Sequence, residues 1–305
     1  MPTIGDAVTR TKRLLSSNTR TELDAVETEI SSASESTLHL KYQTDGIRAG
    51  SYLSVGNNTI GYETMYVHSR NGEYATVQRG VDGSTALSTI AVGVDIEVEP
   101  RFSGHQIFEA VKDAIRVLPE NLFAVDTVEA AFGTSDQAVT VTLSNGFIRI
   151  LSAIRTARSS EDRLLKFNVT MQEYDGTYKL VRQEGLEKAV TAYVTYAYPF
   201  VTSNLAITRD LVDDVKLSSE MQDIPTLGAA AALVLGEEST RLDLHAAGDS
   251  RGDAALNPGD RMRYSLVLQG QYQRRISEEA RRLMSQYGIR TDAASSSAYP
   301  TTLLR

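Results

Sequence analysis

The chain has 305 residues, of which 41% are hydrophobic and 23% charged, so a wholly disordered or collagen-like protein is excluded. It contains no cysteine, which excludes disulfides, thiolate metal sites and a cysteine nucleophile. The formal net charge of −8 argues against a surface adapted as a whole to nucleic acid.

The length exceeds a typical domain of roughly 100 to 200 residues, so we expect more than one folding unit. No apolar stretch reaches the roughly 18 residues of a membrane span, and the N-terminus lacks the apolar core of a signal peptide. The protein is therefore expected to be made and used without a membrane.

The first predicted element is helical. Residues 1–35 carry apolar side chains at broken helical spacing, which predicts one or two short helices interrupted near residues 16–18. These apolar positions are Val8, Leu14, Leu15, Leu23, Val26 and Ile30.

Residues 36–100 change to the period of a β-strand and predict a small β-module. The alternating apolar positions are Leu38, Leu40, Tyr42, Leu53, Val55, Met65 and Val67. Asn71-Gly72 lies between two such runs and predicts a tight hairpin, because this pair readily supplies residues at positive φ.

A short amphipathic helix is predicted within residues 101–122, as a bridge between two β-regions. Ser103 stands in the place of an N-cap, Gln106 follows three residues later as in a capping box, and Pro119 ends the run.

Residues 123–204 return to strand alternation and predict an antiparallel β-sandwich. Asp175-Gly176 predicts a hairpin within it. One apolar face consists of Phe167, Val169 and Met171, and another of Val190, Ala192, Val194, Tyr196 and Tyr198.

Residues 205–290 predict a helical hairpin. Pro225 and Gly248 punctuate the first helix, and the second is expected from about residue 259 to 287. Its predicted apolar stripe consists of Met262, Leu266, Tyr272, Ile276, Leu283 and Met284. Leu266 is therefore expected to be buried between antiparallel helices, where Leu266→Asp would leave an unpaired charge.

Residues 291–305 are polar and lack periodicity, so they are expected to form an extended arm that becomes ordered on a neighbouring protein. The simpler alternative is fraying at a terminus. Together these elements predict an α+β chain with a small N-terminal β-module, a central antiparallel β-sandwich and a C-terminal helical hairpin with an extended arm.

The two C-terminal helical segments carry opposite charge. Residues 205–258 contain ten acids and four basic residues, whereas residues 259–290 contain seven arginines and three acids. Pairing within the hairpin and pairing between neighbouring copies in a ring both account for this pattern. Arg274-Arg275 and Arg281-Arg282 could also meet phosphates, but no aromatic residues are interleaved as in a nucleic-acid groove.

No catalytic, cofactor or metal site is predicted, and we expect that the protein is not an enzyme. His39, His68, His105 and His245 are scattered without the spacing of metal ligands, and the common nucleophile and phosphate-loop motifs are missing. Carboxylates in residues 184–187 and at Asp213-Asp214 cannot be paired from the sequence, and the integrin-type tripeptide at 251–253 is a weak match.

The region from residue 38 to 115 resembles a module of neck and head–tail connector proteins of tailed bacteriophages. In that family a Glu-x-Met-x-Val strand precedes an Arg-Gly-x-x-Gly-(Ser/Thr) hairpin and then an amphipathic helix. The matching residues are Glu63, Met65, Val67, Arg79, Gly80, Gly83 and Ser84. The segment "ALSTIAVG" lacks the histidine that family members usually carry after the hairpin alanine.

The two predicted C-terminal helices resemble the same family. The resemblance implies a structural protein of the virion that is assembled in the bacterial host cytoplasm. It would form a ring, expected to be a dodecamer, beneath the portal protein, and would contact downstream neck or tail proteins. Double-stranded DNA would pass through its channel without sequence-specific binding.

The alternative function is a tail or baseplate adhesin that binds carbohydrate through a β-sandwich. Such a module is expected to expose aromatic side chains on a concave face. Its only candidates are Tyr193, Tyr196 and Tyr198, and the chain has no tryptophan.

Overall fold

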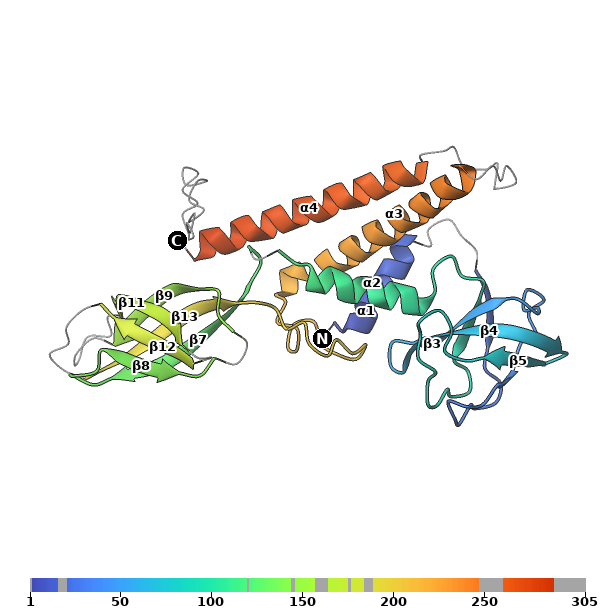
Figure 1. The fold of residues 1–305 in the computed structure, drawn as a ribbon, viewed down its shortest axis with the longest axis horizontal. Helices are drawn as coiled ribbons and strands as arrows, with labels where there is room; N and C mark the ends of the chain where they lie inside the picture. Colours follow the sequence, from blue (N-terminus) through green and yellow to red (C-terminus); the bar gives the residue numbers. More distant parts are fainter. Residues whose placement is uncertain are drawn as a thin grey trace, which may run out of the picture. The chain divides into compact units, whose positions relative to one another are not determined.

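The computed structural model describes residues 2–15, 21–119, 121–143, 146–156, 164–174, 177–183, 189–246 and 260–287 (Figure 1). The chain divides into two compact parts, Met1–Pro119 with Val201–Ile276 and Glu120–Phe200 with Ser277–Arg305. Antiparallel sheets and packed helices make an α+β fold, which confirms the predicted class.

The predicted small β-module is an antiparallel sheet of six strands, curved into a half-barrel (Figure 1). Its strands are β1 (Glu22–Ala25), β2 (Thr37–His39), β3 (Tyr52–Asn57), β4 (Gly61–Asn71), β5 (Tyr74–Gln78) and β6 (Asp95–Val98). Their order across the sheet is β1-β6-β3-β4-β5-β2. The alternation of apolar residues arises because one face of each strand packs into a single core, which includes Leu38, Leu53, Met65, Val77 and Ile96.

The edges of the half-barrel meet just beyond β1 and β2. Val26 forms a β-bridge with Leu40, so the first and last strands of the sheet are joined. The carboxylate of Asp24, which is 1% exposed, accepts hydrogen bonds from the backbone N–H groups of Tyr42 and Thr44, both at 2.8 Å. This carboxylate therefore ties β1 to the segment that follows β2.

Three local predictions in this region were wrong. Residues 22–25 form β1 rather than helix, because their backbone pairs with β6. Tyr42 lies beyond the end of β2 and is 65% exposed. The hairpin between β4 and β5 exists, but Gly72 at φ +60° is the residue with positive φ, and Asn71 is the last residue of β4.

Three helices of the first part pack on one another: α1 (Ile4–Leu15), α2 (Gly104–Arg116) and α3 (Ile224–Ala246). The capping box predicted for α2 is confirmed. The Ser103 hydroxyl accepts a hydrogen bond from the N–H of Gln106 at 3.2 Å, and the Gln106 side chain accepts one from the N–H of Ser103 at 3.1 Å. The helix ends at Arg116, three residues before Pro119.

The last helix, α4 (Asp260–Gln286), packs against α3 and runs antiparallel to it (Figure 1). The hydroxyl of Ser265 donates to the carbonyl of Ala231 at 3.2 Å, and Arg275 pairs with Asp223 at 2.8 Å. Gly228 on α3 lies against Tyr272 on α4, since a Cβ at this position would stand 3.0 Å from the ring of Tyr272. A helical hairpin is therefore present, and α3 and α4 contact each other.

The first helix of the predicted hairpin, α3, begins at Ile224, beside Pro225 as expected, so residues 205–223 of the range 205–290 precede it. Residues 201–223 contain only one helical turn, η1 (Ser219–Met221), and otherwise form an irregular segment. This segment pairs with the N-terminus, where Thr3 and Asp210 form a β-bridge. The N–H of Leu211 also donates to the carbonyl of Pro2 at 2.9 Å.

The predicted burial of Leu266 was also wrong, since this side chain is 57% exposed. The buried positions of α4 are Ser265, Leu268, Ile276, Glu279, Ala280 and Leu283. A helix advances about 100° per residue, so Leu266 lies about 100° from the middle of this buried stripe. The sequence pattern gave the wrong buried face because α4 also carries apolar residues on its exposed side.

The second part contains two small antiparallel sheets (Figure 1). One has the order β10-β9-β13-β7, and its strands are β7 (Ala124–Phe132), β9 (Arg149–Thr156), β10 (Leu164–Lys166) and β13 (Val190–Tyr198). The other has the order β11-β12-β8, with β8 (Ala138–Val141), β11 (Val169–Tyr174) and β12 (Thr177–Arg182). Both contribute to one core, which includes Phe132, Phe167, Leu180 and Val194.

The hairpin predicted at Asp175-Gly176 agrees with the pairing of β11 with β12. Tyr174 is paired with Thr177, so two residues connect the strands. Residues 175 and 176 themselves lie outside the described part of the chain.

Asp24→Asn tests how the edges of the half-barrel are joined. Burial raises the pKa of Asp24, but hydrogen bonds from backbone N–H groups outweigh burial, so its pKa lies below the ordinary value of 3.8. A depressed folded pKa stabilises the fold above the ordinary pKa, and this stabilisation is lost as the pH falls through the folded pKa. We expect the variant to lose about 1–3 kcal/mol of unfolding free energy at neutral pH.

The measurement is urea unfolding of both proteins at neutral pH and at about pH 3 or below, where the difference between them should shrink. The control is Asp45→Asn at an exposed position, with an expected change within about 0.5 kcal/mol. A difference between wild type and Asp24→Asn that is independent of pH would contradict the assigned role.

The orientation of α4 is tested by the same substitution at two nearby positions. Leu268 is 3% exposed and Leu266 is 57% exposed. Leu268→Asp should therefore lower the free energy of unfolding by about 3–5 kcal/mol, because it buries an unpaired charge. Leu266→Asp should stay within about 0.5 kcal/mol in the monomeric fraction isolated by size exclusion. Equal losses in thermal unfolding would show that the orientation is wrong.

Candidate functional site

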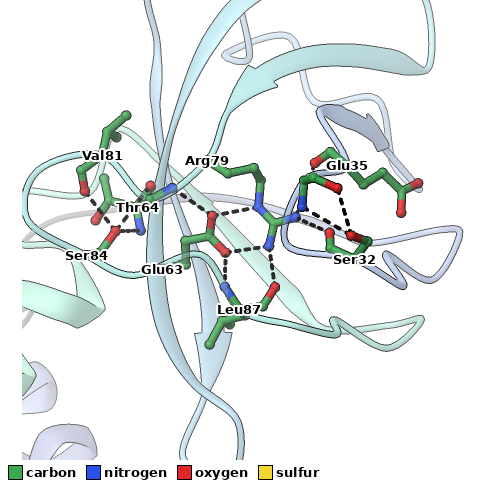
Figure 2. A network of polar contacts seen from close by, with 10 residues as sticks. Ser32, Glu35, Glu63, Thr64, Arg79, Val81, Ser84 and Leu87 are labelled. Carbon is green, nitrogen blue, oxygen red and sulfur yellow. Dashed lines mark hydrogen bonds and ion pairs between the residues drawn. The ribbon is translucent and has the colours of Figure 1, made fainter.

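Two residues of the motif that resembles the connector family, Glu63 and Arg79, form a buried ion pair in the half-barrel (Figure 2). Glu63 lies on β4 and Arg79 follows the end of β5, and their side chains are 0% and 5% exposed. The guanidinium of Arg79 donates to both carboxylate oxygens of Glu63, at 2.6 Å from Nε and 2.7 Å from Nη2. This bidentate geometry is the strong form of the arginine–carboxylate interaction.

The surrounding backbone completes the hydrogen bonding of both charged groups (Figure 2). Glu63 also accepts from the N–H groups of Gly80 and Leu87, both at 2.9 Å. The remaining guanidinium N–H groups reach the carbonyls of Leu87 at 2.8 Å and of Ser32 and Glu35, both at 3.2 Å. All five guanidinium donors are thereby used, so none remains for a ligand. We call Glu63, Arg79, Gly80 and Leu87 the clasp.

The other motif residues shape the loop that the clasp holds. Gly80 has φ +63°, and a Cβ there would stand 3.0 Å from the backbone nitrogen of Ala86, so glycine is required. The hydroxyl of Ser84 accepts from the N–H of Thr64 at 2.9 Å and donates to the carbonyl of Val81 at 2.8 Å (Figure 2). The motif is therefore built as one structural unit that fixes residues 80–87 on β4.

The three histidines whose side chains the structure describes, His39, His68 and His105, do not gather into a site. His39 bonds to the hydroxyl of Thr28 at 2.8 Å and stacks on Tyr74, and the ring of His68 meets the edge of Tyr66. Among the residues that the structure describes, no group of three or more histidine or acidic side chains is placed to hold a metal ion. The side chain of His245 lies outside this description.

Asp213 and Asp214 belong to a turn. The carboxylate of Asp214 accepts from the N–H of Asp210 at 2.9 Å and pairs with Arg209 at 3.1 Å. These interactions, the hydrogen bond first, lower the pKa of Asp214. The carboxylates at 184–187, the tripeptide at 251–253 and the arm at 291–305 lie outside the described residues.

A polar cavity of about 290 Å³ lies beside α1 and the half-barrel. Three charged side chains line it, Lys12, Asp95 and Glu97, and Lys12 forms an ion pair with Glu97. The hydroxyl of Tyr62 donates to Asn58 at 2.7 Å, and burial together with the nearby Glu97 raises the pKa of Tyr62 to about 12. Lys12 and Glu97 bond to each other, and Tyr62 stays protonated at neutral pH, so their arrangement does not indicate acid–base catalysis.

The aromatic candidates for carbohydrate binding are largely inside the fold. Tyr196 is 2% exposed and Tyr198 is 4% exposed, and only Tyr193 is half-buried. Two of the three side chains are thus unable to stack on a sugar at the surface.

The outer side of α4 is an exposed surface with both apolar and basic residues. Met262, Leu266 and Val267 are 47%, 57% and 55% exposed. Arg263 and Arg274 are exposed on the same side, and a Cβ added at Gly270 would meet nothing within 4 Å. We call Met262, Arg263, Leu266, Val267, Gly270 and Arg274 the α4 outer face.

The structure supports intrachain pairing for part of the opposite charge on the C-terminal helices. Arg275 bonds to the carboxylate of Asp223 through Nε at 2.8 Å and Nη2 at 3.2 Å. Arg263 and Arg274 lie on the exposed side, away from this contact. The apolar and basic residues of α4 were identified from the sequence, but their common exposed face was missed. The spacing indicates this face, because Met262 and Leu266 are four residues apart and Arg263 and Arg274 are eleven apart.

Glu63→Gln tests the clasp against the same substitution in an exposed pair. Removing the charge leaves Arg79 buried without a counter-ion, so unfolding free energy should fall by about 3–5 kcal/mol. Glu109 is 40% exposed and pairs with Lys112 along α2, so Glu109→Gln should cost about 0.5 kcal/mol or less. The measurement is urea unfolding, and a loss at Glu63 no larger than that at Glu109 would contradict a structural role for the clasp.

No protein-family model matches this chain, and a search of curated proteins also finds no match. Within the described residues, no helix is long and apolar enough to cross a lipid bilayer. No family is therefore assigned to the chain.

Proposed function

We propose that the protein is a structural component of a tailed-bacteriophage virion, a neck or head–tail adaptor that forms a ring beneath the portal and around the DNA channel. Its partners would be further copies of itself, expected as a dodecamer, the portal protein and downstream neck or tail proteins. DNA would pass through the ring without sequence-specific binding, and assembly would take place in the host cytoplasm.

The observation that supports this proposal best is how the clasp around Glu63 and Arg79 is bonded. Glu63 and Arg79 use their hydrogen-bonding groups on each other and on the backbone of one loop. A motif with this arrangement stabilises a module instead of binding a substrate, which is what a structural protein requires. Its order along the chain, strand, hairpin and then α2, is the order in the resembled family.

The α4 outer face supports assembly. Three large apolar side chains within six residues are left exposed in a single copy. Exposed apolar groups that lie together commonly mark protein contacts. The proposed role is structural, without enzymatic activity.

The proposal includes the arrangement of the second part of the chain. We regard the two small sheets of residues 124–198 as a β-sandwich, because residues from both contribute to one core around Phe132 and Leu180. The adhesin alternative has no comparable support, since Tyr196 and Tyr198 are buried.

Size-exclusion chromatography with light scattering tests the proposed ring. Twelve copies of the 33.3 kDa chain would give a particle of about 400 kDa with a central channel in electron micrographs. Incubation with portal rings should yield a co-migrating complex. A chain that stays monomeric at every concentration, with or without portal protein, would refute the proposed function.

A further inference from the structure

The surface of the half-barrel has the opposite charge to α4. Residues 21–99 contain twelve acids and four basic residues, so their net charge of −8 equals that of the whole chain. Helix α4 contains six arginines and three acids. Opposite charge on two surfaces steers association and fixes its register.

The acidic excess is concentrated at one edge of the half-barrel. Residues 21–30 and 90–99 contain seven acids and no lysine or arginine. The two segments run side by side, because β1 pairs with β6 and Ile30 forms a β-bridge with Ile90. We call six of their exposed residues, Glu22, Leu23, Glu27, Glu29, Val92 and Asp95, the acidic rim.

The acidic rim also carries exposed apolar side chains. Leu23 is 56% exposed and Val92 is 59% exposed, close to the values of Leu266 and Val267 on the α4 outer face. One surface therefore presents apolar groups among carboxylates, and the other presents apolar groups among arginines. This match is expected of surfaces that pack together, with a desolvated centre and charged surroundings.

We propose that the acidic rim of one copy binds the α4 outer face of the next copy. The two surfaces are different, so each copy uses its rim toward one neighbour and its α4 toward the other. Such a head-to-tail contact generates a closed ring when the rotation between copies allows it. The inference rests on the proposed function, and it names the surfaces through which the ring forms.

The apolar residues distinguish this partner from DNA. A phosphate backbone attracts arginine, but it gives no reason for exposing Met262, Leu266 and Val267 beside Arg263. A second copy supplies both the carboxylates and the apolar groups. A second copy, and not DNA, is therefore the partner expected for the α4 outer face.

The absence of cysteine from the chain allows a direct test by cross-linking. Leu266→Cys and Val92→Cys are made as separate full-length proteins, mixed, assembled and treated with a short bismaleimide. A covalent dimer should form in the mixture and not in either variant alone, because the contact joins two different surfaces. A control mixture replaces Val92→Cys with Val117→Cys, an exposed apolar position outside both surfaces, and should give no dimer.

Charge reversal provides a second readout of the same contact. Arg263→Glu should raise the concentration needed for half-assembly about tenfold, since it places a carboxylate against the acidic rim. Adding Glu27→Arg or Glu29→Arg on the neighbouring surface should restore assembly. Light scattering as a function of concentration measures both effects.

The outcomes separate this inference from the proposed function. A wild-type chain that never assembles overturns both. A ring that forms normally while the 266–92 dimer is missing and Arg263→Glu has no effect overturns only the contact proposed here. Cross-linking of Leu266→Cys to itself would show a symmetric contact and overturn it as well. The same holds if Arg263→Glu leaves the ring intact but abolishes binding of double-stranded DNA.

Discussion

The buried ion pair between Glu63 and Arg79 is the interaction on which the half-barrel depends. A buried charge is tolerated only when its partner and its remaining hydrogen bonds are supplied, and here the backbone of residues 80–87 supplies them. The loop is held on β4, and the chain then returns through β6 to α2. The start of α2 is fixed in turn, because the N–H of Gly104 donates to Ser54 on β3 at 2.9 Å.

Elements with local signals were predicted well from the sequence. The capping box of Ser103 and Gln106 involves residues three apart, and it is present as expected. Strand β1 was missed because its identity comes from pairing with β6, about 70 residues later, which leaves no mark in its own short pattern. The inward side of α4 was misjudged because Ser265, a small polar residue, is buried at the contact with Ala231.

The sequence identified the right residues for the candidate site but not their role. Glu63 and Arg79 stand sixteen positions apart, and only the sheet brings a fully buried carboxylate against a guanidinium that bonds to three backbone carbonyls. The residues of the α4 outer face were also identified without their role. Leu266 and Met262 were expected to be buried inside the helical hairpin. In a single copy both side chains are exposed.

The bridge between Thr3 and Asp210 bears on how the chain can fold during synthesis. The half-barrel is built from a continuous stretch and can form early, whereas the first residues of the chain must wait for a partner about 200 residues later, roughly 10–40 s of translation. The side of α1 that packs on α3 stays uncovered during this interval, because α3 has not yet been made. Slow completion of long-range contacts exposes a nascent chain to aggregation, so the face of α1 that α3 covers is open to this hazard until residues 224–246 have been made.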